Sequence, residues 1–232
     1  TTGSYILFMD DDTQAHKEMI QELLKVLQKA PRVGIVQPKI FNMEERNILQ
    51  GIGCNINLLT GRVSALGIRE IDRGQYDEIG EIPTVGCIWM IKREVIEKIG
   101  GYDEEYFIPY EDLDFSFRVR QNGFKILFAP KALAWHKGIK STFINPLIDY
   151  IGIRSSDRAY RIARNKMIFM RKFSPFPKNL LFFFLLMPLY VLIHSLIIII
   201  AWRLDVLYQY WLGVLSGLWY SLGYPFKDQK TS

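Results

Sequence analysis

Three consecutive carboxylates, Asp10-Asp11-Asp12, directly follow the apolar run Tyr5–Met9, and this junction constrains the fold more than any other feature of the chain. The apolar run predicts a buried parallel β-strand, and open α/β sheets place their ligand sites at the carboxyl ends of such strands. Three neighbouring negative charges repel one another unless a cation lies among them. Carboxylate oxygens suit Mg²⁺ or Mn²⁺, and such an ion most often holds a diphosphate.

The same triplet allows a simpler interpretation, in which Asp12 or Thr13 only caps the next helix. That helix is predicted over residues 15–29, where apolar residues recur at helical spacing. The predicted stripe is Met19, Ile20, Leu23, Leu24 and Leu27.

A second acidic cluster, Tyr110-Glu111-Asp112-Leu113-Asp114, predicts the start of another helix. This helix is expected to stop at Asn122-Gly123, because glycine commonly terminates helices. A strand over 124–128, then Pro130, and then His136 follow. Acidic residues at a helix start also have an ordinary explanation in the helix dipole, and a single histidine at a strand end is often structural.

The ordered set of motifs over residues 3–136 resembles family 2 glycosyltransferases with a GT-A fold, especially the rhamnosyltransferase-like branch. The family pattern comprises a small Gly-Ala or Gly-Cys pair, a Gly-Gly-Phe/Tyr-Asp-Glu turn, an acidic helix start, and then Arg, Gly, Pro and His. The matching residues are Gly86-Cys87, Gly100-Gly101-Tyr102-Asp103-Glu104, Glu111-Asp112-Leu113-Asp114, Arg118, Gly123, Pro130 and His136. The implied fold class is α/β, a GT-A nucleotide-diphospho-sugar transferase domain.

The resemblance implies a role for each matching position. Asp10 and Asp12 correspond to the ends of the Asp-x-Asp motif, and His136 to a histidine that often completes the metal or diphosphate site. Asp112 corresponds to the general base that deprotonates the acceptor hydroxyl in this inverting family. Positions expected around the donor and acceptor are Asp11, Gly86, Cys87, Trp89, Glu111 and Arg118.

Two of these positions carry a specific expectation. Gly86 falls where the family packs backbone close to the donor sugar, and a side chain there would obstruct it. Trp89 lies in a predicted core strand over 82–91, so packing competes with sugar stacking as its role. Between the motifs, the sequence predicts a short strand over 33–38 and a variable loop over 42–80.

In the family, the Asp-x-Asp motif is preceded by a segment that holds the nucleotide base. This sequence starts at Thr1, inside the fold, so we expect an N-terminally truncated fragment or a base held by another chain. The two cysteines, Cys54 and Cys87, predict neither a disulfide framework nor a cysteine-rich zinc site.

Residues 151–179 form a basic stretch, in which Arg154, Arg158, Arg161 and Arg164 share a helix face. Nucleic acid is one conceivable partner, but the following segment favours lipid headgroups. Leu180–Trp202 contains no charged residue apart from His194. The length and composition of this segment are sufficient for a membrane-spanning helix, although a buried helix of a soluble protein has the same composition. Arg161 and Arg164 are expected to contact lipid-linked phosphate, because Arg164-Asn165 resembles a family element that precedes the membrane.

A second apolar stretch, Val206–Tyr224, carries Gly213, Gly217 and Ser221 at four-residue spacing, a pattern that lets helices approach closely. It is predicted to return through the membrane or to lie in the interface. Basic residues flank the apolar pair on both sides, which predicts that the catalytic domain and the tail face the cytoplasm.

Four regions are therefore expected: a catalytic domain over 1–150, a basic juxtamembrane segment over 151–179, one or two membrane helices over 180–224, and a polar tail over 225–232. The predicted function is sugar transfer from a nucleotide-diphosphate donor to a polyprenyl-linked glycan at the cytoplasmic membrane face, with Mg²⁺ or Mn²⁺. The alternative is a non-catalytic membrane scaffold or carbohydrate-binding subunit that retains the fold. Processive polysaccharide synthesis is disfavoured because the chain has no Gln-x-x-Arg-Trp motif.

Overall fold

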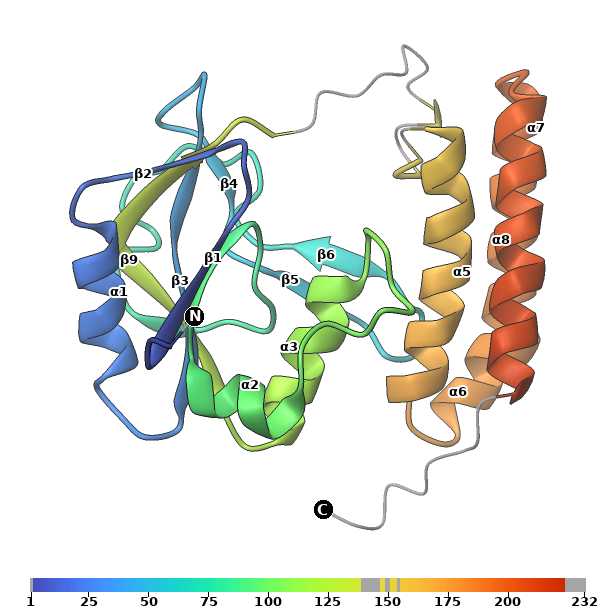
Figure 1. Cartoon of the computed structure of the whole chain (residues 1–232). Coiled ribbons are helices and arrows are strands. Elements are labelled where there is room, and N and C mark those ends of the chain that lie inside the picture. The colour runs from blue at the N-terminus through green and yellow to red at the C-terminus, as the bar shows by residue number, and fades with distance from the viewer. Residues whose placement is uncertain (1, 139–146, 149–150, 154, 224–232) are drawn as a thin grey trace. The chain divides into compact units, whose positions relative to one another are not determined.

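The computed structural model describes residues 2–138, 147–148, 151–153 and 155–223. The chain divides into two compact units (Figure 1). The first unit comprises Thr1–Asn55, Val63–Asp103 and Glu111–Ile139, and the second comprises Ile56–Arg62, Glu104–Tyr110 and Lys140–Ser232. Arg154, Tyr224 and the predicted tail over 225–232 lie outside the described residues.

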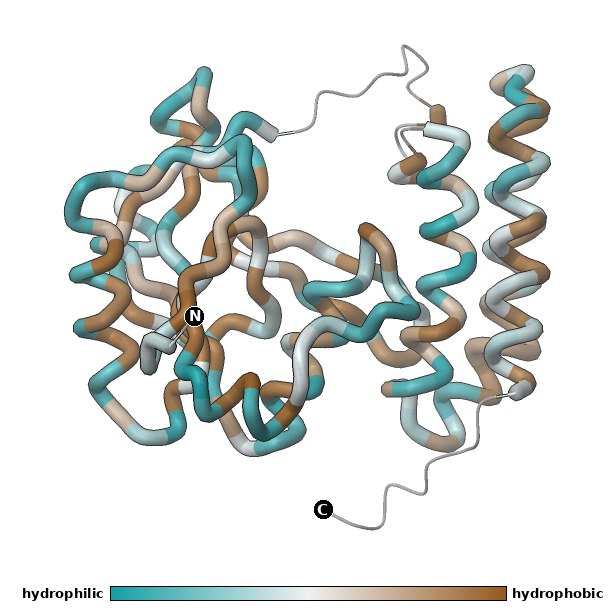
Figure 2. Tube along the Cα trace, viewed as in Figure 1, coloured by the Kyte–Doolittle hydropathy of each residue, from teal (hydrophilic) through white to brown (hydrophobic). Residues whose placement is uncertain are grey.

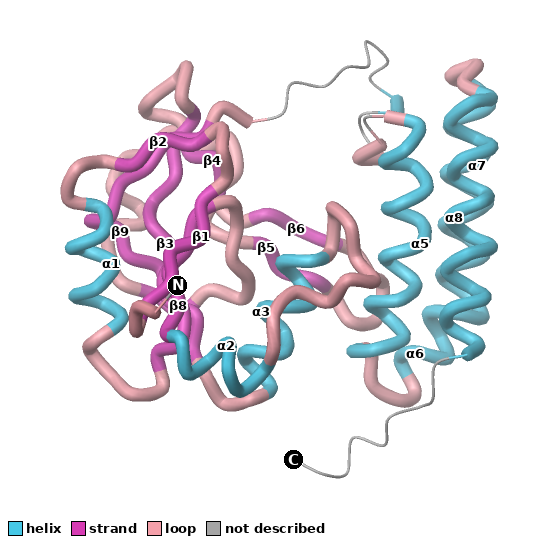
Figure 3. Tube along the Cα trace, viewed as in Figure 1, coloured by secondary structure: helices cyan, strands magenta, loops and turns pink. Residues whose placement is uncertain are grey.

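The first unit is built on a seven-stranded sheet with the strand order β1-β8-β3-β9-β2, and the short strands β4 and β7 pair with β3 and β9 (Figure 3). β3 and β9 run parallel, whereas the other described pairings of this sheet are antiparallel. The strands are β1 Tyr5–Met9, β2 Thr13–Ala15, β3 Val33–Asn42, β4 Leu49–Gly51, β7 Gly80–Glu81, β8 Ile88–Lys92 and β9 Lys125–His136. β5 Cys54–Ile56 and β6 Val63–Ala65 form a separate two-stranded sheet.

Strand β1 forms at the predicted residues, but the prediction that it is buried and parallel is wrong. It pairs antiparallel with β8, from Tyr5 opposite Lys92 to Met9 opposite Ile88, and its side chains are half-buried or exposed. β8 lies between β1 and β3 in the sheet. An apolar run specifies a strand but not the direction of the strand beside it. Here that neighbour is β8, which lies about eighty residues later in the chain.

The core forms two layers, one on each side of β3, whose residues are buried from Val33 to Phe41. On one face, Val36 packs in a cluster with Leu23 of helix α1 (Met19–Leu27). On the other face, Ile35 packs in a cluster with Val95 of α2 (Arg93–Ile99) and Phe115 of α3 (Glu111–Gln121). Because side chains alternate along a strand, a strand that is buried along nearly its whole length, as β3 is, must be covered on both faces.

Helix α1 begins at Met19 rather than at residue 15, because Thr13–Ala15 form β2 instead. Its N-cap is Glu18, so the interpretation of Asp12 or Thr13 as a helix cap is wrong. In the predicted stripe, Met19, Leu23 and Leu27 are fully buried and Leu24 packs partly against the core, but Ile20 is 50% exposed.

The other elements of the first unit also differ from prediction mainly in length. α3 begins at Glu111 and ends before Gly123 as predicted, but the strand after it extends through Pro130 to His136. The strand predicted over 82–91 begins only at Ile88. The predicted loop over 42–80 contains short strands. An ion pair with Lys39 holds this loop against the sheet: Lys39 is 2% exposed, and its Nζ atom lies 2.9 Å from an Asp72 carboxylate oxygen.

The second unit is helical. It contains α5 Ser156–Phe173, α6 Lys178–Leu181, the π-helical turn η1 Phe182–Leu186, α7 Met187–Ile200 and α8 Leu204–Gly223. The π-helical turn precedes Pro188, which has no N–H to donate to the carbonyl group four residues earlier. Lys178–Ile200 is long and apolar enough to cross a membrane, the one such helix among the described residues. Figure 2 shows the hydrophobic residues along α7 and α8.

The glycine face of α8 packs against α5. A Cβ atom at Gly213 would overlap the Tyr160 carbonyl oxygen, and one at Gly217 would lie 2.9 Å from the Met167 sulfur. Ser221 is buried on the same face, and its carbonyl oxygen accepts a 3.0 Å hydrogen bond from Arg171 Nε. The predicted close helix approach is therefore confirmed, with the basic helix α5 as the partner.

Candidate active site

The end of the β1–β8 ladder brings Asp10 and Cys87 together. The register that pairs Met9 with Ile88 continues by one residue, because the Asp10 N–H donates to the Cys87 carbonyl oxygen at 3.0 Å. Directly opposite residues in an antiparallel pair have neighbouring side chains. The regular backbone of two strands therefore fixes the separation of this carboxylate and this thiol.

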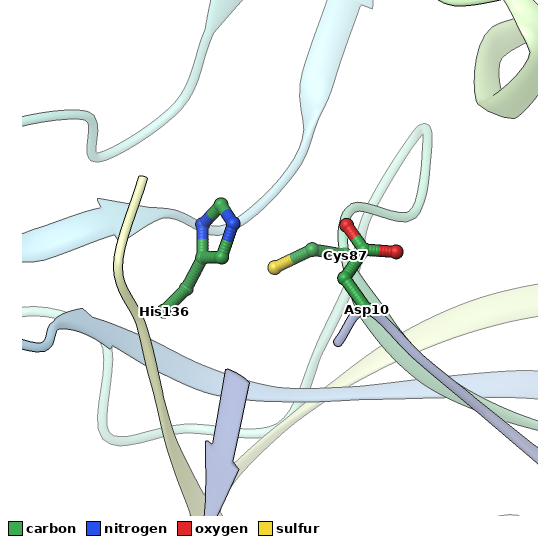
Figure 4. Close-up of side chains that lie close together, drawn as sticks. All are labelled: Asp10, Cys87 and His136. Atoms are coloured by element: carbon green, nitrogen blue, oxygen red, sulfur yellow. The ribbon is translucent and has the colours of Figure 1, made fainter. Parts of the chain in front are cut away.

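A second ladder adds His136. Thr13 of β2 pairs with His136 of β9, and the Lys137 N–H donates to the Asp12 carbonyl oxygen at 3.0 Å. His136 Nε2 lies 3.1 Å from Asp12 Oδ1. One ligand atom each from Asp10, Cys87 and His136 all lie within 4.8 Å of one another (Figure 4).

The electrostatics of this cluster favour a cation. Partial burial is the main cause of the raised pKa of Asp10. The nearby His136 lowers this pKa, and the negative charges of Asp12 and Asp11 raise it. Burial raises the pKa of the Cys87 thiol to about 12, with Asp10 as the next contribution. Two carboxylates and an imidazole are a suitable donor set for a divalent ion, so the residues fit the metal that the Asp-x-Asp motif implies.

Asp112 lies in the first turn of α3, where its carboxylate Oδ1 accepts a 2.6 Å hydrogen bond from the Tyr102 hydroxyl. Burial raises the pKa of Asp112 to about 7, the Tyr102 hydrogen bond lowers it, and Glu111 and Asp10 raise it. A carboxylate with a pKa near neutrality is suited to exchange protons at physiological pH. Because the charge of Asp10 contributes to the raised pKa of Asp112, the two carboxylates are near enough to interact.

Three of the predicted donor or acceptor positions lie around this cluster. Asp11 is exposed, and Glu111 is half-buried beside Asp112 at the helix start. The Gly86 N–H donates to the Gln37 side-chain oxygen at 2.6 Å, and an added Cβ at Gly86 would meet only that oxygen, at 3.6 Å. Within the part of the chain that the structure describes, no atom therefore requires glycine at this position.

Two other predicted positions have structural roles. Trp89 is 1% exposed and stacks on Phe8 with ring centroids 4.1 Å apart, so the packing role is the one observed. Arg118 donates from Nε to Asp114 at 2.7 Å, from Nη1 to the Ile99 carbonyl at 3.0 Å and from Nη2 to the Gly101 carbonyl at 2.7 Å. These bonds hold the glycine turn onto α3, which argues against the predicted ligand contact.

The two arginines predicted to contact lipid phosphate lie on α5. Arg161 forms an ion pair with Asp157 and stacks over the Phe107 ring at 4.3 Å from its centroid. Arg164 Nη1 donates to the Glu105 carbonyl oxygen and Nη2 to its carboxylate, each at 2.6 Å. Both guanidinium groups therefore have protein partners within the helical unit.

Sequence reasoning missed Tyr102 and Gln37 as residues that hold the site. The only signal for Tyr102 was its place in the Gly-Gly-Tyr-Asp-Glu turn, where the family takes Phe or Tyr. Gln37 lies in a buried strand and is 1% exposed. A buried glutamine side chain must find a hydrogen-bond partner, and this requirement could have identified Gln37 from the sequence.

The model of the family described as "Glycosyltransferase like family 2" matches residues 1–145. The chain belongs to this family. With the mixed sheet and the strand-end carboxylates described above, the predicted α/β GT-A fold is confirmed.

Similar curated proteins include the probable glycosyltransferase YdaM of Bacillus subtilis, 28% identical over 59% of this chain and 31% of that protein. The low-salt glycan biosynthesis hexosyltransferase Agl10 of Haloferax volcanii is 26% identical over 70% of this chain and 49% of its own length. The dTDP-rhamnosyl transferase RfbF of Shigella flexneri is 28% identical over 72% and 53%. The chain thus spans between about a third and about half of the length of these relatives.

Solved structures align with this chain more weakly. A crystal structure of GalNAc-T7 with UDP, GalNAc and Mn²⁺ aligns with a TM-score of 0.46 at 18% identity, over 71% of this chain and 34% of that one. The mannosyltransferase PcManGT of Pyrobaculum calidifontis, in complex with GDP-Man and Mn²⁺, aligns with a TM-score of 0.41 at 13% identity, over 94% and 63%. Similarity at this level carries no argument about ligands.

Proposed function

We propose that this protein transfers a sugar from a nucleoside-diphosphate donor to an acceptor hydroxyl, with inversion at the anomeric carbon. The observations that support the proposal are the approach of both Asp10 and Asp12 to His136 and the contribution of Asp10 to the raised pKa of Asp112. The names of two relatives specify hexosyl and rhamnosyl transfer, which supports a hexose-type donor.

The proposed chemistry uses Asp112 as the general base. Its carboxylate takes the proton of the acceptor hydroxyl while that oxygen attacks the anomeric carbon, and the bond to the diphosphate breaks. Asp10, Asp12 and His136 would hold Mg²⁺ or Mn²⁺, which when bound neutralises charge on the departing diphosphate. The hydrogen bond from Tyr102 keeps Asp112 oriented and favours its ionised form.

We further propose that residues 1–150 form the catalytic domain and that 180–224 anchor it to the membrane after the basic segment 151–179. The apolar span Lys178–Ile200 supports membrane attachment. The flanking basic residues favour a cytoplasmic catalytic domain, where a polyprenyl-linked glycan is the proposed acceptor. The role of Arg161 and Arg164 as phosphate contacts stays a prediction, since both also have protein partners.

The decisive experiment offers the purified protein a panel of nucleotide sugars with a lipid-linked acceptor, and measures release of the nucleoside diphosphate and labelling of the lipid. We expect activity that requires a divalent ion and is lost in Asp12→Ala. A protein that binds nucleotide sugar but labels no acceptor under any condition would instead favour the carbohydrate-binding scaffold. Full activity in excess EDTA would contradict the proposed metal role.

A further inference from the structure

The apolar helix α8 of the second unit is packed along the charged helix α5. At the start of α5, the Ser156 hydroxyl donates to an Asp205 carboxylate oxygen of α8 at 2.5 Å. Near the end of α5, Arg171 Nε donates to the Ser221 carbonyl oxygen of α8 at 3.0 Å. The rise from Asp205 to Ser221 is about 24 Å at 1.5 Å per residue, so α8 follows α5 over most of its length.

Helix α7 belongs to the same bundle. Side chains of all three helices line a small cavity of about 20 Å³, among them Lys166 of α5, His194 of α7 and Tyr210 of α8. The Lys166 ammonium group lies 4.8 Å from the centroid of the Tyr190 ring, and the ring centroids of His194 and Tyr210 are 5.6 Å apart. The depth of α5 in a membrane therefore sets the depth of α7 and α8.

Helix α5 carries too many charges to cross the hydrocarbon of a bilayer. Its charged residues are distributed along its whole length: Asp157, Arg158, Arg161, Arg164, Lys166, Arg171 and Lys172. Lys and Arg are among the costliest residues to place at the centre of a bilayer, and Asp157 is the one acidic residue of this helix. We therefore expect α5 to lie at the headgroups or in water.

The other contacts of α5 point to the same depth. The Asn165 side-chain amide donates to the Phe107 and Pro109 carbonyl oxygens at 3.1 and 2.7 Å. The Ser174 hydroxyl, at the C-cap of α5, donates to the Leu58 carbonyl oxygen at 2.6 Å. Phe107, Pro109 and Leu58 lie in irregular segments, and irregular backbone does not occur against lipid inside the hydrocarbon. Because α7 and α8 are packed along α5, they cannot cross the hydrocarbon without taking these segments with them.

The face of α8 that points away from α5 is apolar and open. Gly213 and Gly217 face α5, and residues two positions further along a helix lie about 200° around its axis. Those residues, Leu215 and Trp219, are 58% and 81% exposed. This open face comprises Tyr208, Trp211, Leu215, Trp219 and Leu222. Its aromatic residues include Trp211 near the middle of α8, whereas the Trp and Tyr of a membrane-crossing helix gather near its two ends.

We propose that the helical unit binds one leaflet of a membrane in the plane of its surface, and that α7 and α8 do not cross the bilayer. Their open apolar faces enter the lipid to interfacial depth, and α5 lies on the aqueous side of α8. Exposed leucines of α7, such as Leu192 and Leu196, add to the lipid-facing surface. The excess of basic residues on α5 favours anionic phospholipid. The inference rests on the proposed membrane attachment and is independent of sugar transfer.

The test measures depth along α8 in vesicles of phosphatidylcholine and phosphatidylglycerol. A fluorescent probe is attached to one introduced cysteine of the whole protein, in Tyr208→Cys, Leu215→Cys or Leu222→Cys, and Cys54→Ser and Cys87→Ser remove the native thiols. Lipids with a nitroxide near the headgroup or near the end of the acyl chain quench the probe according to its depth. Neighbouring probes are seven residues apart and would differ in depth by about 10 Å in a helix that crosses the bilayer. We expect one shared, shallow depth for all three.

Two further measurements accompany these probes. A probe in Asp157→Cys, at an exposed position of α5, should be quenched least by either lipid. Circular dichroism verifies that each variant is folded. In the protein with its native cysteines, the fluorescence lost in Trp211→Phe reports the depth of the middle of α8 without a label, so the inference is tested even if the serine variants do not fold.

The outcomes separate this arrangement from membrane attachment itself. A Leu215 probe about 10 Å deeper than the other two, or a native Trp211 quenched most by the deep nitroxide, would overturn the in-plane arrangement and leave the attachment intact. Failure of the folded protein to float with the vesicles would overturn the attachment and the inference together. An open face that neither lipid quenches, in a dimeric protein, would assign that face to a second copy and also overturn the inference.

Discussion

Replacing Tyr102 with phenylalanine removes one hydroxyl and leaves the ring among its aromatic neighbours. The lost interaction is the 2.6 Å hydrogen bond to Asp112 Oδ1, which lowers the pKa of that carboxyl. A hydrogen bond to a charged group contributes ~1.5–3 kcal/mol, and the lower end applies because Tyr102 is 39% exposed and water replaces part of the bond. Since 1.36 kcal/mol corresponds to one pKa unit, the pKa of Asp112 should rise by about one unit in Tyr102→Phe.

The assay is the pH dependence of kcat/KM for sugar transfer. With a pKa of about 7, Asp112 is about half ionised at neutral pH in the wild-type protein, and about a tenth ionised in the variant. We expect a fall in kcat/KM of about fivefold at pH 7 and near recovery at pH 9, with the acid limb displaced to higher pH.

Tyr76→Phe is the matched control, because Tyr76 also donates to a carboxylate, at 3.0 Å to Glu70, in the loop of the first unit. This variant should leave the pH profile in place. An acid limb that does not move in Tyr102→Phe, or that moves equally in Tyr76→Phe, would refute the reasoning.

Three further predictions concern stability and the helical unit. Because burial raises the pKa of Asp112 from 3.8 to about 7, the folded state binds more protons than the unfolded state between these values, and stability falls as pH rises through that range. Asp112→Asn should therefore raise the free energy of unfolding at pH 8 by ~1–2 kcal/mol but not at pH 3, and equal effects at both pH values in chemical denaturation would contradict this. Gly213→Ala should destabilise the α5–α8 pair by ~1–3 kcal/mol, measured by thermal unfolding in detergent. Gly223→Ala is the control and should not destabilise it, because a Cβ atom there meets nothing within 4 Å. Equal melting temperatures of the two variants would contradict the close packing of α8 on α5. If Arg164 contacts phosphate, Arg164→Gln should reduce the use of a lipid-linked acceptor more than Glu105→Gln does. Equal losses of acceptor use in the two variants would show that the 2.6 Å Arg164–Glu105 ion pair has only a structural role.

The sequence predicted the elements of the fold better than their partners. Runs of apolar, strand-forming residues identified β1 and the start of β3. Gly123 marked the end of α3, because its φ of +82° favours glycine. The antiparallel β1–β8 pairing was missed because strand direction depends on the path of the chain between the two segments. The start of α1 was placed too early because Thr13–Ala15 are held in a strand by β9, a tertiary effect that local propensity does not contain.

For the site, the sequence likewise predicted the residues better than their contacts. Asp10, Asp12 and His136 were identified through their order in a family pattern, and the β-ladders explain why residues so far apart in sequence converge. Arg118 matched the same pattern, but its guanidinium group is used by backbone carbonyls and Asp114, which a motif does not reveal. The Tyr102–Asp112 bond and the approach of Cys87 to His136 depend on distances that only the folded chain supplies.

The central claim is that Asp112 removes the proton of the acceptor in a metal-dependent sugar transfer. The most direct measurement compares single-turnover transfer by wild-type protein and Asp112→Asn at saturating donor, together with the affinity of each for the nucleotide sugar. Asparagine keeps the shape and the bond from Tyr102 but does not accept the proton. We predict unchanged donor affinity and a transfer rate lower by ~10²–10⁴. A loss smaller than about tenfold, with donor binding intact, would contradict the assignment of Asp112 as the base.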